Sequence, residues 1–112
     1  MCIRDRDKTA RLDAWMAAAR AARVRPLVAI EHSWTPGRER LAPTPAQYTS
    51  LIRRLRARYP EVRTFSPWNE ANHASQPTAR RPELAATYWR LMRRACPGCT
   101  CLLYTSPSPR DS

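Results

Sequence analysis

Apolar residues follow a helical period in three segments of this chain, and two short stretches between those segments have the character of strands. The helical segments span roughly residues 8–23, 45–59 and 82–95, and the strands span 27–30 and 62–65. Residues 27–30 form a continuous apolar run, which is typical of a parallel strand that is covered on both faces. The order helix, strand, helix, strand, helix predicts βαβ units and therefore a parallel sheet.

The middle helix has the clearest boundaries in the sequence. Thr44 is the predicted N-cap, Pro45 takes the first helical position, and Gln47 completes a capping box. We expect the helix to end near Tyr59, because Pro60 disfavours helical geometry in the residue before it. Its predicted buried face consists of residues spaced i, i+3, i+4 and i+7, namely Tyr48, Leu51, Ile52 and Leu55.

The other two helices also carry an apolar face. In the first helix this face consists of Leu12, Trp15, Met16 and Ala19. In the third helix it consists of Leu84, Tyr88, Leu91 and Met92. Trp15 and Trp89 lie within these helices, and we expect both rings to belong to the core.

The predicted fold class is α/β, specifically part of a (β/α)8 TIM barrel with about two β/α units and a preceding helix. The spacing from Leu27 to Arg63 is comparable with the roughly 30 residues per unit of such a barrel. A doubly wound sheet fits the same order of elements but favours a glycine-rich phosphate loop after a strand. The chain has 2 glycines, Gly37 and Gly98, and they form no such loop.

The two ends of the chain share a feature at the level of DNA. The codons ATG TGT ATA AGA GAC AG encode Met1 to Asp5 and begin Arg6, and their reverse complement encodes Cys101 to Thr105 in another frame. We therefore interpret residues 1–6 and 101–112 as derived from a sequencing adapter, leaving 7–100 as an internal piece of a larger barrel. Chance, or a genuine Ser/Pro-rich tail, is the alternative interpretation.

The net charge of +11 at pH 7 raises the question of nucleic-acid binding. The basic residues are almost all arginine, and Lys8 is the only lysine, which together with abundant Ala and Pro is typical of a GC-rich genome. Many of these arginines fall on outer helix faces, where a solvated surface is the simpler explanation. We therefore expect no nucleic-acid partner. No apolar run approaches the roughly 20 residues of a membrane span.

Cys96 and Cys99 enclose Pro97-Gly98 at the end of the third helix. A redox Cys-x-x-Cys motif usually opens a helix, where the helix N-terminus lowers the thiol pKa, so this position argues against a thioredoxin-like role. A zinc site would need a second pair of ligands. A short local disulfide and a pair of reduced structural thiols both remain open.

Candidate chemistry follows the second predicted strand, in Pro67-Trp68-Asn69-Glu70-Ala71-Asn72. Active sites of barrel enzymes lie at the carboxyl ends of the strands, which makes Glu70 the candidate catalytic residue. Its simpler interpretation is a loop carboxylate paired with an arginine, and Asn69 would then only cap a turn.

This stretch resembles the end of the fourth strand in clan A retaining glycoside hydrolases, most closely family 39-like domains, with the preceding strand as the third. The resemblance implies that Glu70 is the general acid/base, that Asn69 binds the sugar 2-hydroxyl, and that a second Glu, the nucleophile, lies on a later strand. Such an enzyme places its two carboxyl groups about 5–5.5 Å apart. The acid must keep its proton near neutral pH, and Trp68 is a candidate for the apolar wall that would raise its pKa.

Further candidate substrate-binding residues lie near the same predicted edge of the sheet. His32 and Trp34 follow the first strand, and His73 follows Glu70 in the second loop. We expect His32 to contact substrate hydroxyls, or else to form structural hydrogen bonds, and His73 to line the cleft. Trp34 and Trp68 are candidates to stack on sugar rings.

The resemblance implies hydrolysis of an oligosaccharide or polysaccharide, with no metal and no organic cofactor. Two other functions fit less well: a non-catalytic carbohydrate-binding barrel and an arginine-rich nucleic-acid-binding piece. The parent's location is open, with a secreted or cell-envelope site slightly favoured and no signal peptide to be seen in an internal piece.

Overall fold

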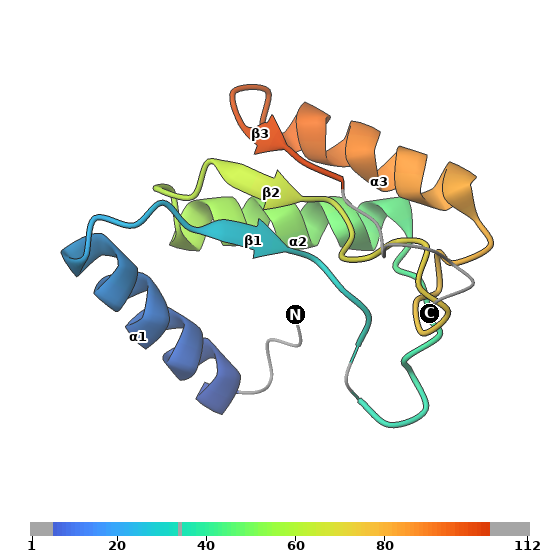
Figure 1. The fold of residues 1–112 in the computed structure, drawn as a ribbon, viewed down its shortest axis with the longest axis horizontal. Helices are drawn as coiled ribbons and strands as arrows, with labels where there is room; N and C mark the ends of the chain where they lie inside the picture. The colour runs from blue at the N-terminus through green and yellow to red at the C-terminus, as the bar shows by residue number, and fades with distance from the viewer. Residues whose placement is uncertain (1–5, 34, 104–112) are drawn as a thin grey trace.

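The computed structural model describes residues 6–33 and 35–103, and in this part of the chain helices alternate with strands. The elements in chain order are α1 (Arg6–Ala21), β1 (Leu27–Ala29), α2 (Pro45–Arg58), β2 (Thr64–Ser66), α3 (Pro82–Ala95) and β3 (Thr100–Cys101). The strands form one parallel sheet in the order β1-β2-β3, and their arrows point the same way in Figure 1. The predicted α/β class and parallel sheet are confirmed, whereas β3 was not expected from the sequence.

Helices cover one face of this sheet. Val28, Phe65 and Cys101 occupy one row across the three strands and belong to or pack against the same apolar cluster as α2 and α3. The neighbouring row begins with Leu27 and Thr64, and Leu27 is 41% exposed. The prediction that the first strand is covered on both faces is therefore wrong for the described residues, because α2 and α3 both pack on the Phe65 side.

The boundaries of α2 agree with the prediction from the sequence. The Thr44 hydroxyl accepts a hydrogen bond from the Gln47 backbone N–H at 3.2 Å, and the Gln47 side-chain oxygen accepts from the Thr44 N–H at 2.9 Å. This reciprocal capping box satisfies two backbone donors that have no partner within the helix. At the other end, the Tyr59 N–H donates to the Leu55 carbonyl and closes the last turn.

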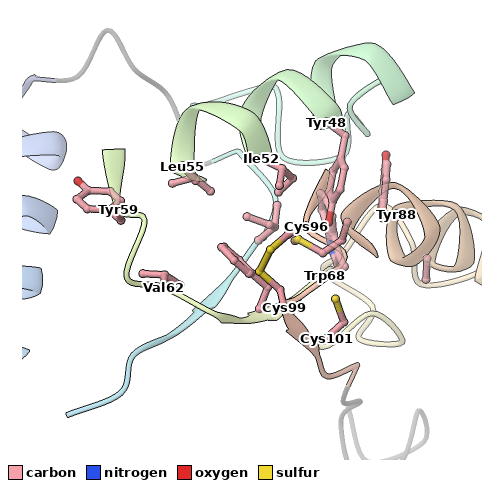
Figure 2. Close-up of a cluster of buried hydrophobic side chains, with 14 of the residues drawn as sticks. Tyr48, Ile52, Leu55, Tyr59, Val62, Trp68, Tyr88, Cys96, Cys99 and Cys101 are labelled. Atoms are coloured by element: carbon pink, nitrogen blue, oxygen red, sulfur yellow. A yellow bond between two sulfur atoms is a disulfide. The ribbon is translucent and has the colours of Figure 1, made fainter. Parts of the chain in front are cut away.

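Three aromatic rings stack in the core where α2, α3 and the loop after β2 meet (Figure 2). The rings of Tyr48 and Tyr88 lie 4.4 Å apart between centroids, and those of Trp68 and Tyr88 lie 5.2 Å apart. The hydroxyls donate outward to loop carbonyls, Tyr48 to Pro67 at 2.7 Å and Tyr88 to Pro43 at 2.6 Å. Burial raises the pKa of Tyr88 to about 12 and raises that of Tyr48 further, so both phenols stay protonated donors.

Fewer residues of α1 pack against the core than predicted. Met16 and Ala19 are buried, but Trp15 is 52% exposed, so its assignment to the core is wrong. Trp15 is one residue away from Met16, which turns its side chain about 100° from the narrow stripe that faces the core. Trp89 on α3 does pack, partly buried, against the apolar cluster.

An ion pair joins α1 to the end of α2. The Asp13 carboxylate accepts hydrogen bonds from the Arg58 guanidinium (Nε at 3.0 Å) and from the Tyr59 hydroxyl at 2.6 Å. These two donors, Arg58 first, lower the pKa of Asp13 from 3.8 to about 2. The carboxylate is therefore held in its charged form down to strongly acidic pH.

The cysteines after α3 resolve the alternatives that the sequence left open. Cys96 and Cys99 form a disulfide, and Cys101 is a buried free thiol in β3 (Figure 2). Cys101 is thus part of the sheet, although its codon falls within the segment that we interpreted as adapter-derived. Residues 1–5 and 104–112 of the two presumed adapter ends lie outside the described residues.

We expect the Asp13 ion pair to make stability depend on acidic pH. Because its folded pKa is lowered, Asp13 contributes stability above its unfolded pKa of about 4, and this is lost as pH falls through about 2. Asp13→Asn should lower Tm at pH 6, and the difference from wild type should shrink between pH 4 and pH 2. Glu83→Gln, which breaks the exposed pair with Arg81, is the control and should have no such effect. A pH-independent Asp13→Asn difference would contradict this assignment.

Removal of the Tyr48 hydroxyl should destabilise the core. Tyr48→Phe keeps the ring stack but leaves the buried Pro67 carbonyl without its donor, which costs about 1 kcal/mol and up to roughly 3. Urea unfolding followed by circular dichroism measures this loss. Thr87→Val removes an exposed hydroxyl that donates to the Glu83 carbonyl within α3, and its effect should stay within about 0.5 kcal/mol. Equal losses in the two variants would contradict the importance of the buried bond.

Candidate functional site

The Asn69-Glu70 pair lies just beyond the carboxyl end of β2, beside the end of β1. The Ile30 N–H donates to the Ser66 carbonyl at 3.2 Å, and the Asn69 N–H donates to the Ile30 carbonyl at 2.7 Å. These two bonds continue the parallel ladder past the last residues of both strands. The loops that carry His32 and Glu70 therefore start from adjacent points on one edge of the sheet, as the sequence analysis expected.

Glu70 adopts a backbone conformation that is unusual for its residue type. Its φ is +43°, in the left-handed region, where a residue with a Cβ is strained by roughly 1–2 kcal/mol. The turn continues with a hydrogen bond from the His73 N–H to the Glu70 carbonyl at 2.9 Å. The Glu70 side chain is partly exposed. Strain of this kind persists only where the surrounding contacts determine the backbone.

Those contacts are buried hydrogen bonds on both sides of Glu70. Before it, the Trp68 indole N–H donates to the Gln76 side-chain oxygen at 2.8 Å. After it, the Thr78 hydroxyl donates to the Ala71 carbonyl at 2.7 Å. Both bonds join the turn around Glu70 to residues 76–78, later in the same loop. Residues 68–78 are therefore held together as one hydrogen-bonded unit.

The loop after β1 also contacts this unit. The Arg40 guanidinium donates to the Ala74 carbonyl at 2.8 Å. This bond brings together two loops that follow adjacent strands. Arg40, Gln76 and Thr78 were not predicted from the sequence, because their roles depend on loop partners that leave no periodic signal.

His32 lies at the β1 edge of the site and is partly buried. Its Nδ1 is 2.8 Å from the Ser33 carbonyl oxygen, which can only accept a hydrogen bond. Nδ1 therefore carries a proton, and in the neutral ring Nε2 is the acceptor nitrogen. This tautomer suits a ring that accepts from a hydroxyl group.

His73 is occupied by contacts within its own turn. Its Nδ1 accepts from the Ser75 N–H at 3.1 Å and lies 2.8 Å from the Ser75 hydroxyl. Since Nδ1 accepts from a backbone N–H, the neutral ring carries its proton on Nε2. The structure thus places His73 in the same turn as Glu70 while giving it a local structural partner.

The structure corrects the role expected for Trp68. Its side chain is 1% exposed, with the ring stacked on Tyr88 and the indole N–H bonded to Gln76, so the ring has no open face for a sugar. Trp68 belongs to the apolar core cluster, directly before the Asn69-Glu70 turn in the chain. Trp34, the other expected sugar platform, lies outside the described residues.

The described residues contain no cluster of three or more His, Cys, Asp or Glu that could hold a metal ion. None of the helices in 6–33 and 35–103 is long and apolar enough to span a membrane. A cavity of about 290 Å³ lies at the opposite, amino edge of the sheet, lined in part by Arg63, Thr64 and Thr100. It does not involve the Asn69-Glu70 turn.

Glycine at position 70 should relieve the backbone strain. We expect Glu70→Gly to be about 1 kcal/mol more stable than Glu70→Ala in urea unfolding, because only glycine adopts a positive φ without penalty. Arg23 provides a matched control, since its φ is +58° at the end of α1 and Arg23→Gly should show the same gain over Arg23→Ala. Equal stability of the two position-70 variants would contradict the strained turn.

Comparisons of the chain with protein-family models, with curated proteins and with solved structures found no match.

Proposed function

We propose that this chain is part of the (β/α)8 catalytic barrel of a retaining glycoside hydrolase, in which Glu70 is the general acid/base. The observation that carries the proposal is the position of Asn69-Glu70, at the carboxyl edge of a parallel sheet and beside the end of the neighbouring strand. Enzymes with parallel α/β folds bind their substrates at this edge. The hydrogen bonds that hold residues 68–78 together also support the proposal, because catalytic carboxyl groups must be held in a defined position.

In the proposed mechanism, the protonated Glu70 donates its proton to the glycosidic oxygen as the bond to the leaving group breaks. A second carboxylate, on a strand beyond those described, attacks the anomeric carbon and forms a covalent glycosyl-enzyme. Glu70, now a carboxylate, then takes a proton from water as the water attacks the same carbon and releases the second carboxylate. The product keeps the anomeric configuration of the substrate.

Neighbouring side chains have supporting roles in this proposal. Asn69 hydrogen-bonds the sugar 2-hydroxyl, a contact that strengthens in the transition state. His32 Nε2 accepts a hydrogen bond from another hydroxyl, consistent with the proton on Nδ1. The bound species is an oligosaccharide or polysaccharide, and the chemistry requires no metal or organic cofactor.

The proposal predicts a loss of activity that depends on the leaving group. In the full-length reading frame that contains this chain, Glu70→Gln should lower kcat/KM roughly 10²- to 10⁴-fold on phenyl glycosides, whose leaving group needs protonation. The loss should be far smaller on 2,4-dinitrophenyl glycosides of the same sugar, because dinitrophenolate leaves without a proton. The sugar is the one that wild type hydrolyses fastest in a panel of aryl glycosides.

Glu39→Gln is the matched control, since Glu39 is a partly exposed carboxylate in the loop after β1 and accepts from the Gly37 N–H at 3.3 Å. It should keep wild-type rates on both classes of substrate. Wild-type rates in Glu70→Gln, or equal losses on the two leaving groups, would refute the assignment of Glu70 as acid/base.

A further inference from the structure

The hydrogen bond between Trp68 and Gln76 is buried on both sides. Trp68 is 1% exposed and Gln76 is 4% exposed, and the Gln76 amide nitrogen also donates to the Ser75 hydroxyl at 3.2 Å. Gln76 is one of three buried polar residues among those described, with Ser66 and Thr78, and its side-chain oxygen accepts from the indole N–H. Its amide group is therefore explained by the indole N–H that it satisfies.

This bond restricts the turn that carries Glu70. The Trp68 ring cannot move to follow a displaced partner, because it is stacked on Tyr88, which is itself stacked on Tyr48. The Pro67 carbonyl, one residue earlier, is held by the Tyr48 hydroxyl. The chain that leads into Asn69-Glu70 is thus fixed to the core at Pro67 and Trp68. Gln76 connects Trp68 to the second half of the same loop.

Loss of the Gln76 oxygen would leave the indole N–H buried and unpaired. An unpaired buried donor costs about 1–3 kcal/mol, enough to favour a shift of the turn that lets water reach it. Such a shift acts directly on Glu70, which is two residues from Trp68 and whose backbone lies in the strained left-handed region. A displacement of about 1 Å at a catalytic group can lower the rate roughly 100-fold.

We propose that Gln76 is a positioning residue for the Glu70 carboxyl group, acting through the indole N–H of Trp68. This inference rests on the proposed function and extends it to a residue that does not touch the substrate. Trp68 then acts indirectly, because its buried indole N–H is the fixed donor to which Gln76 binds.

The test compares Gln76→Met with Gln76→Glu in the full-length enzyme. Methionine fills a similar volume without an acceptor, whereas a glutamate side chain of the same length keeps an oxygen that accepts from the indole N–H. Gln76→Met should lower kcat/KM on the phenyl glycoside roughly 10- to 100-fold, with little change in kcat/KM on the 2,4-dinitrophenyl glycoside. Gln76→Glu should restore most of the lost rate. Rates are normalised to folded protein by circular dichroism.

Gln76→Asn is the second variant if Gln76→Met does not fold, since its amide is one methylene too short to reach the indole and keeps the loop polar. It should show the same selective loss. Equal losses on the two leaving groups, or no rescue by Gln76→Glu, would overturn the positioning role while Glu70→Gln still shows its selectivity. If Glu70→Gln itself shows none, the proposed function fails, and this inference with it.

Discussion

Three stacked rings hold α2, α3 and the loop after β2 in one arrangement. Tyr48 from α2 and Tyr88 from α3 lie face to face, and Trp68 continues the stack into the loop. Each of these side chains also donates a hydrogen bond to a loop residue: Tyr48 to Pro67, Tyr88 to Pro43, and Trp68 to Gln76. The same residues therefore provide apolar burial for the core and hydrogen bonds for the edge of the sheet, so the position of Asn69-Glu70 depends directly on core packing.

That dependence explains how a strained residue can persist at the sheet edge. Glu70 has a positive φ, and the residues around it are tied by backbone and side-chain hydrogen bonds to β1, α2 and the far half of their own loop. Backbone strain held by a well-connected shell is common at functional sites, because it presents a side chain where regular structure would not. The proposed acid/base role gives this strain a use.

Much of the framework could be predicted from the sequence, because it rests on local signals. The capping box at Thr44 and Gln47 involves residues three apart, and the apolar run 27–30 needs no distant partner to indicate a strand. The burial of Trp68, the exposure of Trp15 and the role of Gln76 depend on which elements pack together, which no local pattern records. β3 was missed because Thr100–Cys101 is too short to show a strand period and because Cys101 was assigned to the adapter-derived end.

The most direct test of this account is a crystal structure of the full-length protein, from which the separation of two carboxyl groups can be measured. The proposed function predicts a second Glu on a later strand with its carboxyl group about 5–5.5 Å from that of Glu70, across an open cleft. A Glu70 carboxylate directed among the helices, or whose nearest facing carboxylate lies about 6.5 Å away or more, as in an inverting enzyme, would contradict it.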